Sequence, residues 1–284
     1  MYFSPRDRKE YQVRAMERLK AIRLDKDKMT AMIYPVIFGG LIIVLWQTEI
    51  LHKIIGADTF TLPVPNRIVK IIIDNAPAIM RNVKATVFVA LGGLTFGSWL
   101  GYFMAIIASA FARWGVGGLT VISAFNAIPI IAIAPIMNNL TKDFSRDPNV
   151  RSMLAKILVV MITCTVSMSI NAYRGLTELK PFSEDLMRSF AASRWTIFFK
   201  LRVPNSVPYI FTALRVSVPA SIISAMVSEY FAEYIIGVGR QIRENIVLAQ
   251  YATAWAYIAA AFAIGVTMYV ILLCAEGVLL KGRR

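Results

Sequence analysis

Residues 173–208 read YRGLTELKPFSEDLMRSFAASRWTIFFKLRVPNSVP and form the longest polar interval between the apolar segments of this chain. Pro181 and Ser183 predict the start of a short helix, and the acidic residues that follow suit the positive end of its dipole. Ser193 is typical of the cap of a second helix. We expect Pro204 to end that helix, because proline supplies no amide and restricts the residue before it.

This pair of helices should carry both basic and apolar surface. The basic residues are Arg174, Lys180, Arg188, Arg194, Lys200 and Arg202, and the large apolar ones are Leu186, Met187, Phe190, Trp195, Phe198 and Phe199. Such a segment either docks on another protein or lies on anionic lipid headgroups. The residues alone leave both interpretations open.

The composition excludes a soluble domain. The chain has 284 residues, 57% of them hydrophobic, and a mean hydropathy of +0.59. Several runs reach the roughly 20 apolar residues that a helix needs to cross a bilayer. The sequence therefore predicts an all-α membrane protein with about six transmembrane helices. In such a protein a net charge of +14 reports orientation and lipid contact, and we expect no nucleic-acid partner.

The chain divides into a polar start and an apolar remainder. Residues 1–30 are predicted to form a basic amphipathic cytoplasmic arm, and residues 31–284 a transmembrane domain that contains the polar loop 173–206. Basic residues gather on one side of the membrane if both termini and this loop are cytoplasmic. The expected spans are about Ala31–Leu51, Ala85–Ala110, Gly118–Asn138, Met153–Ala172, Val207–Ser228 and Ala252–Val278.

Three glycines in the second span recur every fourth residue: Gly93, Gly97 and Gly101. In lipid, helices associate through close backbone contact, so this face should pack against another helix. Lining a solute pathway is the alternative for the same face.

The third span carries an asparagine and two prolines: Asn126, Pro129 and Pro135. Prolines free backbone carbonyls, which a membrane tolerates only against protein or a wet cavity. These three residues are candidates for a pathway, and a kinked packing helix is the alternative. Glu229 is a fourth candidate. With Glu233 it makes a pair of carboxylates one helical turn apart, which at a membrane boundary is more often solvated or paired than catalytic.

No catalytic or metal-binding set stands out. A phosphate-binding glycine loop is missing, as is a nucleophile with its base. Cys164 and Cys274 fall inside apolar runs, and His52 is the only histidine, so we expect neither a disulfide nor a metal site. The sequence thus predicts a protein that is not an enzyme and has no cofactor of its own.

The polar loop resembles the EAA loop of ABC importer permeases. That signature runs Glu-Ala-Ala, three residues, Gly, and Leu-Pro about a dozen positions later. Here Asp185 takes the place of the Glu, Leu186 and Met187 of the two Ala, Ala191 of the Gly, and Val203-Pro204 of the Leu-Pro. If the Gly serves a positive φ, Ala191 costs about 1 kcal/mol there.

Further short motifs are similar to the nitrate/sulfonate/taurine type of these permeases, over about residues 60–245. They are Leu62-Pro63-Val64-Pro65, Ala85-Thr86, Ile128-Pro129 with Ala134-Pro135, Leu214-Arg215-Val216, Ser228-Glu229 and Gly237-Val238-Gly239. Their order and spacing carry the resemblance, since each motif is short.

The resemblance implies a multi-pass permease subunit of the cell inner membrane that translocates a small solute. It implies a second permease copy, forming a homodimer, an extracytoplasmic solute-binding protein, and separate ATPase subunits that bind ATP and Mg. The residues expected to couple to the ATPase are Asp185, Leu186, Met187, Arg188, Phe190, Ala191, Ser193, Arg194, Trp195 and Pro204.

Two other classes of protein compete with this interpretation. An ion-coupled secondary transporter would place ionisable groups in mid-span or show paired broken helices. A membrane-embedded transferase would need a cluster of acids or histidines at one interface. The charges of this chain crowd at the span ends instead, which favours the permease.

Overall fold

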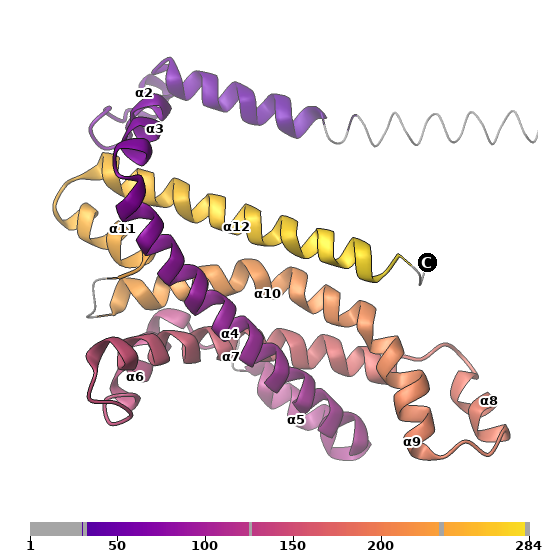
Figure 1. Cartoon of the computed structure of the whole chain (residues 1–284). Coiled ribbons are helices and arrows are strands. Elements are labelled where there is room, and N and C mark those ends of the chain that lie inside the picture. The colour runs from indigo at the N-terminus through magenta and orange to yellow at the C-terminus, as the bar shows by residue number, and fades with distance from the viewer. Residues whose placement is uncertain (1–29, 31–32, 125–126, 233–235, 282–284) are drawn as a thin grey trace, which may run out of the picture. The chain divides into compact units, whose positions relative to one another are not determined.

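The computed structural model describes residues 30, 33–124, 127–232 and 236–281. Every regular element in these ranges is a helix, as predicted (Figure 1). The chain falls into two compact units, residues 1–67 and 68–284. Except for Thr30, the predicted arm 1–30 lies outside the described residues.

The first unit contains an apolar helix, Ile33–Gln47, and the short helix α2, Ile50–Ile55. Glu49 between them adopts a left-handed conformation with φ 61°. The expected first span is therefore interrupted before its end. The buried His52 donates from Nε2 to the Leu62 carbonyl (2.6 Å), so it fixes the following loop.

Four helices of the second unit are long and apolar enough to cross a membrane. They are α4 (Ala76–Ala110), α7 (Pro148–Thr177), the continuous helix Arg194–Phe231 and α12 (Tyr251–Leu279). These helices contain the predicted second, fourth, fifth and sixth spans. Most of them are longer than predicted, because turns with polar residues continue each helix beyond its apolar run.

The glycine face of α4 packs directly on α7. A Cβ added to any of the three glycines would lie 2.3 to 2.5 Å from an α7 atom, closer than any real contact. The facing pairs are Gly93 with Val160, Gly97 with Met161, and Gly101 with Thr165. From one pair to the next, the residue number increases in both helices, so α4 and α7 run parallel. A core cluster of Ala105, Met168, Ala172, Leu176 and Ala213 joins these two helices to α10 (Val203–Phe231).

Because α4 and α7 are parallel, the chain between them returns to the other end of the bundle. It does so in two short helices, α5 (Ala112–Ala124) and α6 (Ile130–Leu140). The prediction of one continuous third span over residues 118–138 is therefore wrong. Pro129 has extended backbone (φ −60°, ψ 129°) and disfavours helix in the residue before it. Pro135 lies inside α6, and Asn126 is outside the described residues.

The two ends of this unit carry different elements (Figure 1). The short helices α8 (Ser183–Ser189) and α9 (Arg194–Ile197) lie at one end. The amphipathic helix α11 (Val238–Val247) and α6 lie at the opposite end. The continuous helix Arg194–Phe231 connects the two ends.

Candidate functional site

Helix α8 is flanked by two residues with left-handed backbone, Phe182 (φ 61°) before it and Ala191 (φ 54°) after it. The Ser183 hydroxyl donates to the Lys180 carbonyl (2.6 Å), and the first turn carries two acids. At the other end, Ala191 N–H binds the Arg188 carbonyl (2.9 Å) and Ala192 N–H the Met187 carbonyl (3.1 Å). This is the Schellman pattern, which needs a left-handed residue. Ala191 supplies it with φ 54°, so the position of the motif glycine does have a positive φ.

Helix α9 begins after Ser193, as predicted, but the helix does not end at Pro204. The Ser193 hydroxyl caps it by accepting from Thr196 N–H (3.2 Å). The chain then continues through a π-helical turn, η2 (Phe198–Arg202), into α10. Val203 N–H binds the Phe198 carbonyl, one residue further back than in an α-helix. The prediction that Pro204 ends the helix is wrong, because proline sits in the first turn of α10, where its missing amide costs little.

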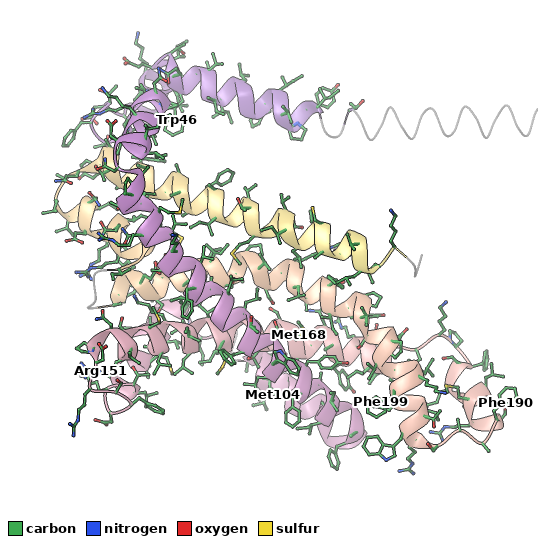
Figure 2. All side chains as sticks on the ribbon, viewed as in Figure 1. Trp46, Met104, Arg151, Met168, Phe190 and Phe199 are labelled. Atoms are coloured by element: carbon green, nitrogen blue, oxygen red, sulfur yellow. The ribbon has the colours of Figure 1, made fainter. Side chains whose placement is uncertain are left out.

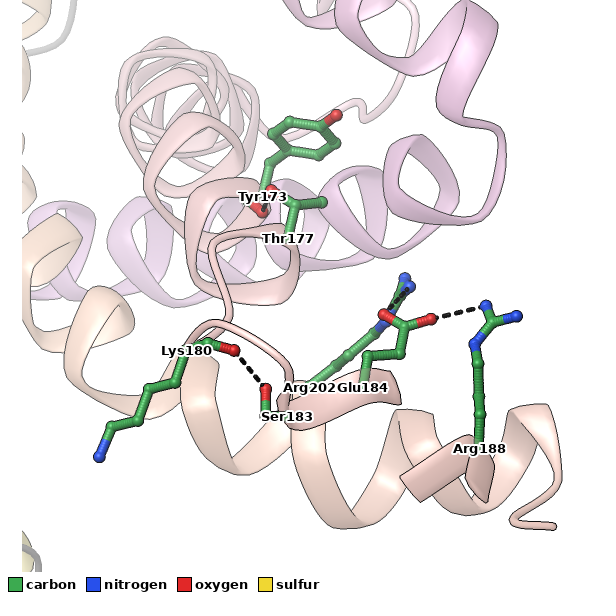
Figure 3. A network of polar contacts seen from close by, with 7 residues as sticks. All are labelled: Tyr173, Thr177, Lys180, Ser183, Glu184, Arg188 and Arg202. Carbon is green, nitrogen blue, oxygen red and sulfur yellow. Dashed lines mark hydrogen bonds and ion pairs between the residues drawn. The ribbon is translucent and has the colours of Figure 1, made fainter. Parts of the chain in front are cut away.

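An ion-pair network joins α8 to the π turn (Figure 3). Glu184 accepts from Arg188 Nη2 (2.8 Å) and from Arg202 Nη2 (3.0 Å). The hydrogen bond from Arg188, together with that from Arg202, lowers the pKa of Glu184. The same contact raises the pKa of Arg188. The two short helices are thus held in a defined relative position without burying a charge.

Five large apolar side chains around α8 and α9 are 60% to 81% exposed, and we call them the coupling surface: Phe182, Leu186, Phe190, Trp195 and Phe199. Figure 2 shows that Phe190 and Phe199 extend outward at this end of the unit. The exposed Asp185, Arg188 and Arg194 lie among them. Met187 is half-buried.

Aromatic contacts attach the coupling surface to the bundle. Trp195 stacks on Phe199, with ring centroids 6.0 Å apart and an interplanar angle of 17°. Phe199 meets the half-buried Phe198 edge-on at 5.1 Å. Phe198 in turn packs against the core cluster of α4, α7 and α10. The exposed rings are therefore connected to the core by direct contact.

Polar contacts fix the neighbouring ends of α7 and α10. Asn205 Nδ2 donates to the carbonyls of Gly175 (2.8 Å) and Glu178 (3.1 Å). The helices approach so closely that a Cβ on Gly175 would lie 2.7 Å from Ser206 Cα. The Tyr102 hydroxyl of α4 lies 3.1 Å from the Ser206 hydroxyl. Beside the coupling surface, α4, α7 and α10 are thus joined by direct polar and backbone contacts.

At the opposite end, Glu229 is fully buried in a group of polar contacts that we call the clasp. Three consecutive amides at the start of α11 point to three acceptors. Gly237 N–H binds Asn82 Oδ1 (3.0 Å), Val238 N–H binds Thr86 Oγ1 (2.9 Å), and Gly239 N–H binds Glu229 Oε2 (2.9 Å). The Thr86 hydroxyl also lies 2.8 Å and 3.0 Å from the two carboxylate oxygens of Glu229.

The two glycines of the clasp permit this close approach. Gly237 has φ 135°, and an added Cβ would lie 2.3 Å from Glu229 Cδ. A Cβ on Gly239 would lie 2.1 Å from the Met226 carbonyl oxygen. The Gly-Val-Gly motif therefore serves to seat α11 on the end of α10.

Sequence reasoning missed three residues at this end. Thr86 stood in the short motif Ala85-Thr86 without a role assigned to it, and Asn82 gave no signal beyond polarity in an apolar helix. Lys156 of α7 is also buried, and its Nζ donates to the Ile236 carbonyl (3.1 Å). A lysine inside an apolar span was the available signal. Lys156 and Glu229 line the same cavity of about 220 Å³. Glu233, the proposed neighbour of Glu229, lies outside the described residues.

The chain is similar to known transport proteins. Residues 93–280 match the family of binding-protein-dependent transport system inner membrane components. A formylaminopyrimidine transport permease of Halalkalibacterium halodurans is 28% identical over 197 residues, covering 69% of this chain and 74% of that protein. A probable ABC transporter permease of Haemophilus influenzae is 23% identical over 69% of this chain and 76% of its own length.

The chain also matches part of another permease and the fold of a solved structure. A bicarbonate transport system permease of Synechocystis is 28% identical over 85 residues, or 30% of each chain. The solved structure of an amino acid ABC transporter aligns with a TM-score of 0.59 at 17% identity, covering 72% of this chain and 95% of that one. At this identity the structural match supports the fold alone.

Proposed function

Because the chain belongs to the family of binding-protein-dependent transport system inner membrane components, we propose that its coupling surface docks a separate ATPase subunit that drives a small solute across the membrane. Family membership confirms the predicted resemblance to ABC importer permeases. The protein is a permease of the ABC importer class and a multi-pass protein of the inner membrane.

The observation that carries the proposal is the coupling surface itself. Large exposed apolar patches mark interaction sites, and aromatic and arginine side chains dominate the energy of protein interfaces. Here five such apolar side chains lie beside Arg188 and Arg194, on helices that caps and ion pairs already hold in place. A preformed surface loses little entropy on docking. The proposed docking residues are those predicted from the sequence, from Asp185 to Trp195, with Pro204 placing the π turn.

The mechanism follows from the connection between this surface and the spans. Closure of the ATPase around ATP and Mg would displace α8 and α9. Phe198 and the continuous helix Arg194–Phe231 would carry that displacement into the bundle. The permease then needs two arrangements of similar free energy, whose populations ATP binding on the partner shifts.

Further parts of the assembly are inferred from the family. We propose that two copies of the chain form the pathway, which fits the slight burial of α12 within one chain. The α8–α9 end and both termini would face the cytoplasm, and the α6–α11 end would meet the solute-binding protein. Asn126, Pro129 and Pro135 stay candidates for lining the pathway, because Pro129 precedes the start of α6 and Pro135 lies inside it, where each lacks a backbone amide.

Capture of the ATPase tests the docking surface. The purified permease should retain its ATPase subunit, and Phe190→Asp with Arg194→Glu should abolish retention. A matched control is Phe144→Asp with Arg146→Glu, which alters an equally exposed phenylalanine between α6 and α7. Retention by the first variant at the wild-type level would exclude this docking surface.

ATP-driven uptake separates the proposal from an ion-coupled transporter. Proteoliposomes that hold the complete transporter should take up solute only with ATP on the α8–α9 side. Formylaminopyrimidine and bicarbonate, the solutes in the relatives' names, are the first two to test. Uptake that follows an ion gradient and ignores ATP would contradict the assignment.

A further inference from the structure

The clasp places the carboxyl group of Glu229 at the start of α11. The carboxylate accepts a backbone amide from the first turn of a ten-residue helix, where the helix dipole favours negative charge. The neighbouring amides are taken by Asn82 and Thr86 of α4, so one set of contacts joins α4, α10 and α11.

The clasp is also the far end of the element that carries the coupling surface. The helix from Arg194 to Phe231 has 38 residues, roughly 57 Å at 1.5 Å per residue. Trp195 lies in its first turn and Glu229 in its last. A tilt or shift imposed at one end therefore reaches the other through a single helix.

The two ends of this helix are held by different kinds of contact. Near the coupling surface, the core cluster packs α10 against α4 and α7 with buried apolar side chains. At the other end, the hydrogen bonds of the clasp accompany the buried apolar side chains of Ala232 and Val238. The net free energy of these hydrogen bonds is small, because water can replace each of them once the site opens. The hydrogen-bonded part of this contact can thus separate at a low cost.

Space beside the clasp allows such a movement. The cavity of about 220 Å³ that Glu229 and Lys156 share lies on one side. A second cavity, of about 400 Å³, is lined by Ile131 of α6, Met226 of α10 and Gly239 of α11. The contact between α10 and α11 is therefore flanked by open volume rather than by close packing.

We propose that the clasp is a latch that opens and closes during transport, with Glu229 as its positioning residue and the apolar core as the pivot. Closed, it holds α11 and α4 to the end of α10. Displacement of α8 and α9 by the ATPase would withdraw Glu229 from the Gly239 amide of α11 and open the face opposite the ATPase. The inference rests on the proposed function, since it requires a driving partner at the coupling surface.

Cross-linking across the clasp is the main test. Val227 of α10 and Ile242 of α11 line the same cavity, and neither side chain belongs to the hydrogen-bonded set. Val227→Cys with Ile242→Cys, in a Cys274→Ser background that leaves only the buried Cys164, can be joined by a short bis-methanethiosulfonate reagent, which forms a reducible disulfide with each cysteine and releases methanesulfinate. In the reconstituted transporter, joining them should lower ATP-driven uptake at least tenfold, and reduction should restore it.

The matched control joins α10 to α4 at the pivot. Ser98 of α4 and Ile210 of α10 line one cavity near the core cluster, and their cysteine pair should transport equally well joined or reduced. Wild-type uptake by the joined clasp pair would overturn the latch while leaving the proposed function intact. If even wild-type protein shows no ATP-driven uptake, the proposed function fails first.

A second pair of variants gives a readout that a purely structural contact would not move. Thr86→Val removes the hydroxyl that joins α4 to Glu229 and to Val238 N–H, whereas Thr86→Ser keeps it. The Val variant should hydrolyse ATP without the solute-binding protein, so that stimulation by that protein falls at least fivefold. The Ser variant should keep it. Unchanged stimulation in the Val variant, or failure of the Val variant to assemble, would overturn the latch and mark the contact as structural.

Discussion

Arg215 of α10 binds Glu276 of α12 through two hydrogen bonds, Nε to Oε2 at 2.8 Å and Nη2 to Oε1 at 2.6 Å. The carboxylate is 13% exposed and the guanidinium 45%. A bidentate pair of this kind is geometrically specific, and it is the main polar link between α10 and α12 in the described part of the chain.

Breaking that pair should destabilise the bundle. Glu276→Gln leaves the Arg215 charge without its partner and should lower the free energy of unfolding by about 1 kcal/mol, a value kept small by the exposure of the guanidinium. Thermal unfolding of the purified protein in detergent measures the effect. The double variant Arg215→Leu with Glu276→Leu should recover most of the loss, because two apolar groups need no partner. Equal melting of Glu276→Gln and wild type would contradict this.

Ala191→Gly should stabilise the turn after α8. Ala191 has φ 54°, which glycine adopts without steric cost, so the gain should be about 1 kcal/mol locally. Hydrogen exchange of the amides of Ala191 and Ala192 reports it. Ala192→Gly serves as the control, because Ala192 has no positive φ and glycine there should only loosen the turn. Faster exchange in the Ala191 variant would refute the strain.

Gly97→Leu should prevent α4 from packing on α7. Even a Cβ there would lie 2.5 Å from the Met161 carbonyl oxygen, and backbone cannot move aside cheaply. Size-exclusion chromatography of the detergent-purified protein should show loss of the folded peak. Gly118→Ala in α5 is the control, since a Cβ there meets nothing within 4 Å and replacing a helical glycine gains about 0.5–1 kcal/mol. A normal folded peak for Gly97→Leu would exclude the tight packing.

The ion pairs of Glu184 predict a pH dependence at α8. Arg188 and Arg202 lower its pKa, so the carboxylate stabilises the folded segment at pH values above its ordinary pKa of 4.5. That stabilisation is lost as the pH falls through the lowered pKa. Protection of the α8 amides, corrected for intrinsic exchange rates, should therefore decrease below about pH 4.5. Glu184→Gln should show weaker protection with no such step, and a step that persists in this variant would implicate another group.

Local chemistry was the part of the fold that could be predicted. Ser193 caps α9, the acidic first turn of α8 begins at Ser183, and long apolar runs mark four of the spans, because each of these depends on neighbours in sequence. The wrong predictions concern prolines, whose effect depends on the surrounding helix as well as on the residue itself. Pro129 interrupts a run that is apolar enough to span, and Pro204 is absorbed by a π turn that no periodicity announces.

The clasp could not be predicted, because its partners come from distant parts of the sequence. Thr86 and Glu229 are 143 residues apart, and only the fold brings the threonine hydroxyl to the carboxylate. The motifs around residues 85–86, 228–229 and 237–239 were visible one by one. The three motifs meet in one contact only because α4, α10 and α11 pack together at this end of the unit.

The π turn at residues 198–202 places one extra residue in an otherwise regular helix. One residue corresponds to about 100° of rotation around a helix axis. Residues before the turn therefore point in a different direction from the one that an uninterrupted helix would give them relative to α10. Loss of a single residue there would turn Trp195 to another side while leaving the membrane-embedded part of the helix unchanged. Permeases of this family could in this way re-aim their contact with an ATPase by a one-residue deletion, without redesigning either partner.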